Sequence, residues 1–278
     1  MVDFLPEGTI LMLVRRFHKN AVLEKNTFTN CHAMNKRQVL WISHRGESII
    51  APENTVSAHR LARELGTDGS ECDVYLTADQ KVIVCHNNTT GMVADRNLDV
   101  QGSTFDELRA LTVANHNPKY QHERLATLPE LFAELGPGRE LYLELKAENL
   151  ALVPAVVSEV RAYGLEPERC VFISFTPSLL KAVKEALPEY RTLFLTHFHK
   201  YNTPDELVAT LRELNADGVD AWAGEPPNVR DYIQALHDAG LYVAVWTIDH
   251  PGYAQRFIDY GVDSITSNCA ADLKGILG

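Results

Sequence analysis

From residue 38 to the C-terminus, short apolar runs alternate with longer amphipathic segments, and the alternation repeats eight times. The apolar runs have the length of single strands. They predict strands at 39–43, 69–74 with a continuation at 81–85, 141–145, 170–174, 191–195, 217–221, 241–246 and 262–266. Strands that alternate with helices pair in parallel through right-handed crossovers. Eight such units close into a barrel, so the sequence predicts an α/β fold with a (β/α)8 TIM-type barrel.

The segments between these runs predict helices with recognisable ends. They cover 54–65, 127–135, 151–163, 177–186, 204–214, 228–239, 251–260 and a final piece near 270–277. Thr176-Pro177 and Thr203-Pro204 each place a capping hydroxyl before a proline at the first helical position. Glycines suited to a left-handed helix end close three of the helices, at positions 164, 240 and 261.

One region departs from the repeat. Residues 87–126 are largely polar and turn-rich, and within them only Thr104 to Leu111 has the pattern of a short helix. A long insertion at the C-terminal end of barrel strands is more often a lid or a specificity loop than a disordered segment. We therefore predict a small insertion after the second strand.

The first 37 residues do not share the barrel pattern. Their apolar stretch from Thr9 to Val14 is preceded by acidic Asp3 and Glu7, whereas a secretory signal begins with basic residues and has a longer apolar core. We expect residues 1–37 to be a mobile extension or a short element packed on the barrel, and residues 38–278 to be the barrel domain. The first 33 residues are then dispensable, and loss of folding or activity in a chain that starts at Met34 would contradict this.

The net charge limits the classes of binding partner, and the cysteine pattern indicates the cellular compartment. With 26 basic and 37 acidic residues, the chain has a net charge of −11, which argues against nucleic acid and anionic membranes as partners. No apolar run approaches the ~20 residues needed to span a bilayer. The cysteines show no CxxC spacing and lie at 31, 72, 85, 170 and 269. We interpret them as reduced thiols in a cytoplasmic protein.

Chemically active side chains gather where the predicted strands end. They are His44, Arg45, Glu71, Asp73, His86, Glu144, Lys146, Ser174, Phe175, His197, Trp246 and Asn268. Glu71 and Asp73 are two residues apart, so on a strand they point to the same side. Three carboxylates in one barrel mouth repel each other unless a cation neutralises them. An oxygen-only ligand set suits Mg²⁺ or Ca²⁺, not zinc.

The remaining polar groups complete a chemical pattern. Arg45 and Lys146 suit an anion bound to that cation, and two histidines on neighbouring strands suit proton transfer. The set indicates metal-assisted phosphoryl chemistry. Each piece alone has a simpler alternative: a Glu-x-Asp pair is usually solvated or salt-bridged, and a lone histidine is usually structural. Their joint occurrence at the same end of successive strands favours the functional interpretation.

These motifs resemble the glycerophosphodiester phosphodiesterase family. The resemblance runs from residue 39 to about 270 and rests on an ordered series: His44-Arg45-Gly46, Pro52-Glu53-Asn54-Thr55, Glu71-x-Asp73, Thr77-x-Asp79, His86, Leu143-Glu144-Leu145-Lys146 and Trp246-Thr247. Single pieces of the series are weak signals, whereas their order is specific. The family has a TIM-type barrel with a small insertion after the second strand, as predicted above for residues 87–126.

The resemblance implies a role for each matched residue. It implies metal ligation by Glu71, Asp73 and Glu144, acid–base catalysis by His44 and His86, phosphate binding by Arg45 and Lys146, and a glycerol wall made by Phe175 and Trp246. Glu53 is left with two alternatives, an approach to the metal or a buried hydrogen-bonding role near the first helix. The implied reaction releases glycerol 3-phosphate and an alcohol, with one divalent cation, Mg²⁺ or Ca²⁺, as cofactor.

The chain departs from the family pattern at two positions. Asn87 follows His86 where the family usually has Asp, and Asn268 ends the last strand near another usual Asp. An amide keeps a hydrogen bond but loses the negative charge, so we expect an effect on pH optimum or specificity.

Three hypotheses of function follow from the sequence. The first is an active phosphodiesterase on small glycerophosphodiesters; the others are a lysophospholipase D-like enzyme and a barrel that binds phosphoryl ligands without turnover. The sequence leaves the alcohol group, the choice of metal, the roles of the two histidines and the oligomeric state open. His197, His199 and Glu225 are candidates for shaping the alcohol pocket.

Overall fold

The computed structural model describes residues 38–114, 117–224 and 228–278. The expectations for residues 1–37, including the dispensable segment and the thiol of Cys31, lie outside the described residues, as does Glu225.

Eight parallel strands close into a barrel, which confirms the predicted fold. Each strand pairs with the next and β1 pairs with both β2 and β9, so the sheet has no open edge along this ring. The strands are β1 (Leu40–Ser43), β2 (Gly69–Leu76), β4 (Glu140–Leu145), β5 (Cys170–Ser174), β6 (Arg191–His197), β7 (Gly218–Trp222), β8 (Tyr242–Trp246) and β9 (Ser264–Ser267). Because all of them run the same way, their C-terminal ends meet at one mouth.

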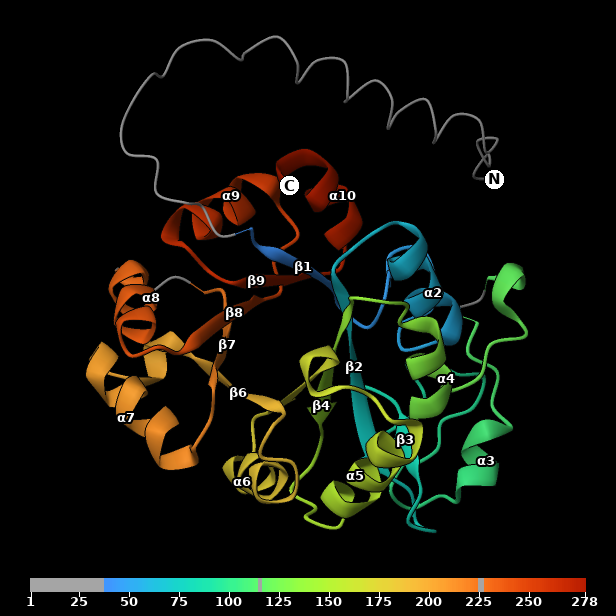
Figure 1. Cartoon of the computed structure of the whole chain (residues 1–278). Helices are drawn as coiled ribbons and strands as arrows, with labels where there is room; N and C mark the ends of the chain where they lie inside the picture. The colour runs from blue at the N-terminus through green and yellow to red at the C-terminus, as the bar shows by residue number, and fades with distance from the viewer. Residues whose placement is uncertain (1–37, 115–116, 225–227) are drawn as a thin grey trace, which may run out of the picture. The chain divides into compact units, whose positions relative to one another are not determined.

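Helices surround this barrel on the outside, as Figure 1 shows. They are α2 (Val56–Glu64), α4 (Leu128–Glu134), α5 (Leu152–Tyr163), α6 (Pro177–Ala186), α7 (Pro204–Leu214), α8 (Val229–Asp238), α9 (Pro251–Tyr260) and α10 (Ala270–Leu277). Thr203 caps α7 as predicted, since its hydroxyl accepts from the Glu206 amide. The predicted cap at Thr176 is wrong: that side chain makes no capping bond, and its backbone N–H donates to Ser174 Oγ instead.

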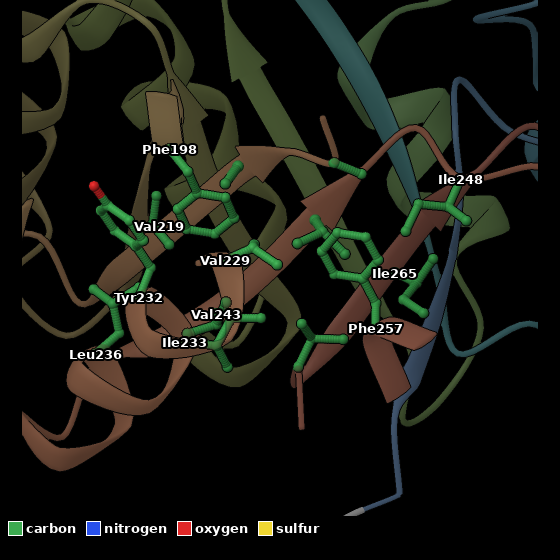
Figure 2. Packing of buried hydrophobic residues seen from close by; sticks show 14 of the residues in the cluster. Phe198, Val219, Val229, Tyr232, Ile233, Leu236, Val243, Ile248, Phe257 and Ile265 are labelled. Carbon is green, nitrogen blue, oxygen red and sulfur yellow. The ribbon is translucent and has the colours of Figure 1, made fainter. Parts of the chain in front are cut away.

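Buried apolar side chains between the strands and the helices form two large clusters. Figure 2 shows Val219, Val243 and Ile265 on the outer face of β7, β8 and β9, where they meet the α8 side chains Ile233 and Leu236 and the α9 side chain Phe257. Burial of this layer removes apolar surface from water and stabilises the barrel. The mouth is thus built on a rigid scaffold.

The side chains on the second face of each strand point into the barrel interior. Successive residues alternate between the two faces of a strand, and Leu141, Leu143 and Leu145 face the helices. Tyr142 and Ile173 instead join the inner apolar cluster. The same alternation in β2 sends Cys72 outward and leaves Glu71 and Asp73 facing inward.

The predicted continuation of the second strand is a separate element. Strand β3 (Val82–Val84) runs antiparallel to β2 and pairs Val84 with Val74. The link between them is too short for the crossover that a parallel pair requires. His86 therefore follows a hairpin return strand and not a barrel strand, which corrects the expectation of two histidines on neighbouring barrel strands.

The described residues between Asn87 and Ala126 pack against this hairpin. They contain α3 (Phe105–Arg109) and a short 3-10 turn, η1 (Pro118–Tyr120), and two more such turns, η2 (Pro167–Arg169) and η3 (Phe198–Lys200), lie elsewhere. Leu108 and Val100 are fully buried against Ile83.

None of the helices in the described part of the chain is long and apolar enough to cross a bilayer.

Candidate active site

A cavity of about 180 Å³ opens at the barrel mouth. Its wall is made by residues in the barrel strands or in the turns that follow strands: His44, Arg45, Glu71, His86, Glu144, Lys146, Ile173, Phe175, Leu195, Asp220, Trp246, Thr247 and Thr266. Eight of the nine residues to which the resemblance gives a role thus share one cavity. The ninth, Asp73, contacts Lys146 and Arg45 at its edge.

The turn after β1 positions the first two of these side chains. Arg45 and Gly46 both adopt positive φ, at 56° and 76°. A Cβ at Gly46 would lie 2.5 Å from the Ala58 backbone, so only glycine fits. The turn aims the Arg45 backbone N–H at Glu71, with 2.9 Å between N and Oε2. A strained non-glycine residue at such a place is typical of a functional site.

Three carboxylates converge in the mouth, as predicted. One oxygen from each of Glu71, Asp73 and Glu144 lies within 4.8 Å of the others. Register explains the grouping, because Asp73 pairs directly with Glu144 across β2 and β4. Burial, and next the negative charge of Asp73, raise the pKa of Glu71 well above its usual value and that of Glu144 to about 7. Such crowding is costly without a cation.

Asp73 keeps its charge more easily than its neighbours. Burial raises its pKa, but the nearby Lys146, His86 and Arg45 outweigh burial and lower it overall. The Lys146 ammonium lies 3.3 Å from Asp73 Oδ1 and 2.9 Å from Glu144 Oε1. Arg45 Nε lies 3.6 Å from Asp73 Oδ2. Both cations therefore border the carboxylates and line the cavity.

The Pro52–Thr55 segment supports this arrangement from behind. Both oxygens of Glu53 lie 3.1 Å from Arg45 Nη1, so Glu53 forms hydrogen bonds, although its side chain is 24% exposed and not buried. Asn54 donates from Nδ2 to Asp73 Oδ2 at 2.8 Å, a contact that the sequence did not predict. Thr55 caps α2 through the Ala58 amide. The motif thus positions one cation and one carboxylate.

Each of the two histidines has its Nδ1 tied to a side-chain amide. His44 Nδ1 lies 2.7 Å from Asn268 Oδ1, and His86 Nδ1 lies 3.0 Å from Asn87 Oδ1. The amides at 87 and 268 therefore keep the hydrogen bond, as expected. Burial, aided by neighbouring cations, lowers the pKa of both histidines. With Nδ1 engaged in this way, Nε2 is the nitrogen left for chemistry.

Aromatic rings extend from the cavity to the surface. The rings of Phe175 and Trp246 lie 5.8 Å apart edge to face, and His197 lies 6.2 Å from Trp246. Trp222 then contacts His197 at 5.3 Å and is 42% exposed. His199 joins the same group on the outer side, so both predicted histidines belong to it.

Two residues that the sequence reasoning missed lie in the cavity wall. Asp220 and Thr266 are 1% and 2% exposed. Asp220 Oδ1 and Thr266 Oγ1 have no hydrogen-bond partner within the described ranges. Burial raises the pKa of Asp220 well above its usual value. An acidic residue inside the apolar run 217–221 was a signal available in the sequence, because carboxylates are almost never buried without a role or a partner.

The donor set fits a hard divalent cation. Asp73 Oδ1 is buried and makes an ion pair but no hydrogen bond with any described residue. Three acidic oxygens at this spacing, with no sulfur or imidazole among them, suit Mg²⁺ or Ca²⁺. Fold and mouth together define a (β/α)8 barrel whose site can hold a cation and a phosphate ester.

Comparison with known proteins agrees with this class. Residues 44–270 match the model of the glycerophosphoryl diester phosphodiesterase family. A glycerophosphodiester phosphodiesterase from Caldanaerobacter subterraneus is 28% identical over 240 residues, which are 83% of this chain and 94% of that protein. A glycerophosphodiester phosphodiesterase structure from Parabacteroides distasonis has a TM-score of 0.73 at 28% identity and covers 87% of this chain and 98% of its own.

A further structure shows the same fold. It is a phosphodiesterase from Oleispira antarctica in complex with the product sn-glycerol-3-phosphate, with a TM-score of 0.77 at 24% identity over 86% of this chain and 96% of that one. The chain belongs to the glycerophosphoryl diester phosphodiesterase family. It is accordingly an enzyme, a phosphoric diester hydrolase.

Proposed function

We propose that the protein hydrolyses small glycerophosphodiesters to glycerol 3-phosphate and an alcohol, with one divalent cation and two catalytic histidines. The observation that carries the proposal is the shared cavity, in which acidic, cationic and imidazole side chains meet. The named function of the relatives and the product bound to the Oleispira protein support the same substrate class.

Glu71, Asp73 and Glu144 would hold the cation, Mg²⁺ or Ca²⁺. When bound, it supplies positive charge that stabilises negative charge on the phosphoryl oxygens. Lys146 and Arg45 border the same carboxylates and line the cavity, where they would bind the substrate phosphate. Their positive charges favour the transition state more than the substrate, because negative charge grows on the phosphoryl oxygens during attack.

His44 and His86 divide the proton transfers between them. With water as the nucleophile, one Nε2 takes its proton and the other histidine gives a proton to the leaving alcohol. Where the substrate's own glycerol hydroxyl attacks, the alcohol leaves from a cyclic glycerophosphate, and a water then opens the ring to glycerol 3-phosphate with the two histidines in exchanged roles. Both rings line the cavity and each is oriented by an amide on Nδ1. Phe175 and Trp246 form the apolar wall for the glycerol carbon atoms.

One observation favours lysophospholipids as a second substrate class. Large apolar side chains stand exposed on loops that follow barrel strands: Ile49 at 66%, Ile50 at 49% and Leu150 at 55%. Apolar side chains near a mouth suit a substrate with an acyl chain. An assay of the released products distinguishes small glycerophosphodiesters from lysophospholipids as substrates.

The test is release of glycerol 3-phosphate from a panel of glycerophosphodiesters, with lysophosphatidylcholine as the lipid member. We expect turnover that stops with a chelator and returns with Mg²⁺ or Ca²⁺. Choline release from the lipid alone would favour the lysophospholipase D-like activity. Binding of the diesters without any turnover would replace the proposal with a phosphoryl-ligand-binding barrel.

His197 gives a prediction about the alcohol group. Its ring connects Phe175 and Trp246 to Trp222 outside the cavity. We expect His197→Ala to change the ranking of choline, ethanolamine, glycerol and inositol diesters, because it removes part of this wall. Metal affinity, measured by calorimetry, should stay the same. His122→Ala, at a ring that is 69% exposed on the insertion, serves as the control.

We also propose a reducing, cytoplasmic location. The four cysteines in the described part of the chain are free thiols, and three of them are buried. Free buried thiols are usual in reducing compartments. Fractionation of cells that express the protein tests the location.

A further inference from the structure

The hydrogen bond on His44 continues beyond Asn268 to an acidic residue. Asn268 Nδ2 donates to Asp249 Oδ2 at 2.7 Å, and the Asn268 backbone N–H donates to Asp249 Oδ1 at 2.8 Å. Ser267 Oγ donates to the same Oδ1 at 3.0 Å. Asp249 thus accepts three hydrogen bonds from the end of β9, and its carboxylate has a single orientation there.

A carboxylate in this place decides which way the amide points. An ionised carboxylate only accepts hydrogen bonds, so Asn268 must present its NH₂ group to Asp249 and its oxygen to His44. The hydroxyl of Ser48, which donates to Asn268 Oδ1 at 3.4 Å, agrees with that orientation. An amide alone would have no such preference, because its oxygen and nitrogen ends have nearly the same shape.

The orientation of the amide in turn decides the tautomer of His44. Since Asn268 Oδ1 is an acceptor at 2.7 Å from Nδ1, the neutral ring carries its proton on Nδ1. Nε2 is then unprotonated, on the side where it lies 3.9 Å from Glu71 Oε2. The His44 backbone N–H donates to Ser267 O at 2.9 Å, which holds His44 at a constant spacing from the end of β9.

We propose that Asp249 is a positioning residue for the reaction, which fixes the tautomer of His44 through the side-chain amide of Asn268. The inference rests on the proposed catalytic role of His44. Asp249 does not line the cavity and touches no reacting atom. Because it is exposed, its charge is screened by water, and it acts mainly through the direction of the hydrogen bonds.

The experiment uses Asp249→Asn and the exchanged pair Asp249→Asn/Asn268→Asp. In the single variant, a side-chain NH₂ group at position 249 takes the place of one carboxylate oxygen and faces the NH₂ group of Asn268. Asn268 can then turn its own side-chain oxygen towards position 249 and accept a hydrogen bond there. The NH₂ group of Asn268 then faces His44 Nδ1, which favours the proton on Nε2. In the exchanged pair, the carboxylate at position 268 accepts both from His44 and from the amide at position 249, so the original tautomer returns.

The first readout is nitrogen-15 NMR of the His44 ring at about pH 8, where histidine is ordinarily neutral. We expect a proton on Nδ1 in the wild type and the exchanged pair, and on Nε2 in Asp249→Asn. The second readout is kinetic: Asp249→Asn should lower kcat by about tenfold with little change in KM, and the exchanged pair should recover most of the loss. Asp238→Asn, on the surface of α8, is the matched control.

An Asp249→Asn variant that keeps the Nδ1 proton and full kcat would overturn the proposal. So would an exchanged pair with wild-type thermal stability and no recovery of kcat, since a merely structural role would then explain the single variant. Asp249→Ala provides a second single variant, with mixed tautomers expected. The NMR result needs no substrate. Absence of turnover in the wild type would therefore reject the proposed function and with it the role of Asp249 in the reaction, while the spectra would still show whether Asp249 fixes the tautomer of His44.

Discussion

Replacement of Glu71 by glutamine is expected to abolish metal-dependent activity and to stabilise the metal-free protein. Glutamine keeps the shape of the side chain but removes the charge and weakens metal ligation, so kcat/KM should fall by more than about 100-fold, the upper range for loss of an outer-shell partner. The stability effect has the opposite sign, because one of three crowded carboxylates disappears.

The pH dependence follows from the raised pKa of Glu71. Burial, and then the charges of Asp73 and Glu144, raise that pKa above its value in the unfolded chain. The metal-free wild type is therefore favoured at pH below the ordinary pKa of glutamate and loses stability as pH rises through the raised value. In Glu71→Gln this loss is absent, so its melting temperature with chelator should exceed that of the wild type at neutral pH.

Thermal melts with chelator and with added Mg²⁺ or Ca²⁺ measure both effects. The wild type should gain stability on addition of metal, because a ligand that binds only the folded state stabilises it. Glu71→Gln should gain little. Glu189→Gln changes an exposed carboxylate between α6 and β6 and should behave as the wild type. An equal metal response in Glu71→Gln and the wild type would remove Glu71 from the ligand set.

Loss of either of the two histidines that we propose as catalytic is the second large effect. We expect His44→Ala and His86→Ala each to lower kcat by about 100- to 10,000-fold, the usual range for general acid–base groups. Metal-induced stabilisation should remain in both variants, since neither ring is among the three grouped ligands.

A change of leaving group assigns the two roles. A diester with p-nitrophenol as the leaving alcohol needs no protonation, so the variant that lacks the general acid should recover most of its rate on it. The variant that lacks the general base should remain slow on both substrates. Equal recovery in both variants would contradict a division of roles between His44 and His86.

The fold was predictable because local and tertiary preferences agree. Alternating runs, helix caps and glycine helix ends placed the barrel strands and helices close to their observed bounds. Residues 81–85 were wrongly predicted to continue the second barrel strand, and the reason is a local turn. Residues 77–81 form a tight turn, with Gln80 at a φ of 60°, and so short a link allows only an antiparallel pair.

The candidate site was predictable only in its residue types. Glu71, Asp73 and Glu144 stood out because carboxylates at strand ends are unusual. Asn54 did not, because it looks like an ordinary loop residue. Two wall residues were not recognised either: Asp220, although it is an acidic residue inside an apolar run, and Thr266. What distinguishes the last two is a buried oxygen without a hydrogen-bond partner among the described residues, and burial of one atom is a tertiary property.

The sequence by itself determined that eight strands and eight helices alternate, and that acidic, basic and imidazole groups stand at the strand ends. The closed barrel decided which of these groups meet. Asp73 faces Glu144 because β2 pairs with β4 in one register, and a shift by one residue would turn both away. His44 reaches Asn268, more than 200 positions later, because β1 pairs with β9. The amino-acid sequence determines which chemical groups stand at the strand ends. Distances of a few ångströms between these groups arise only when strand pairing brings distant parts of the chain side by side.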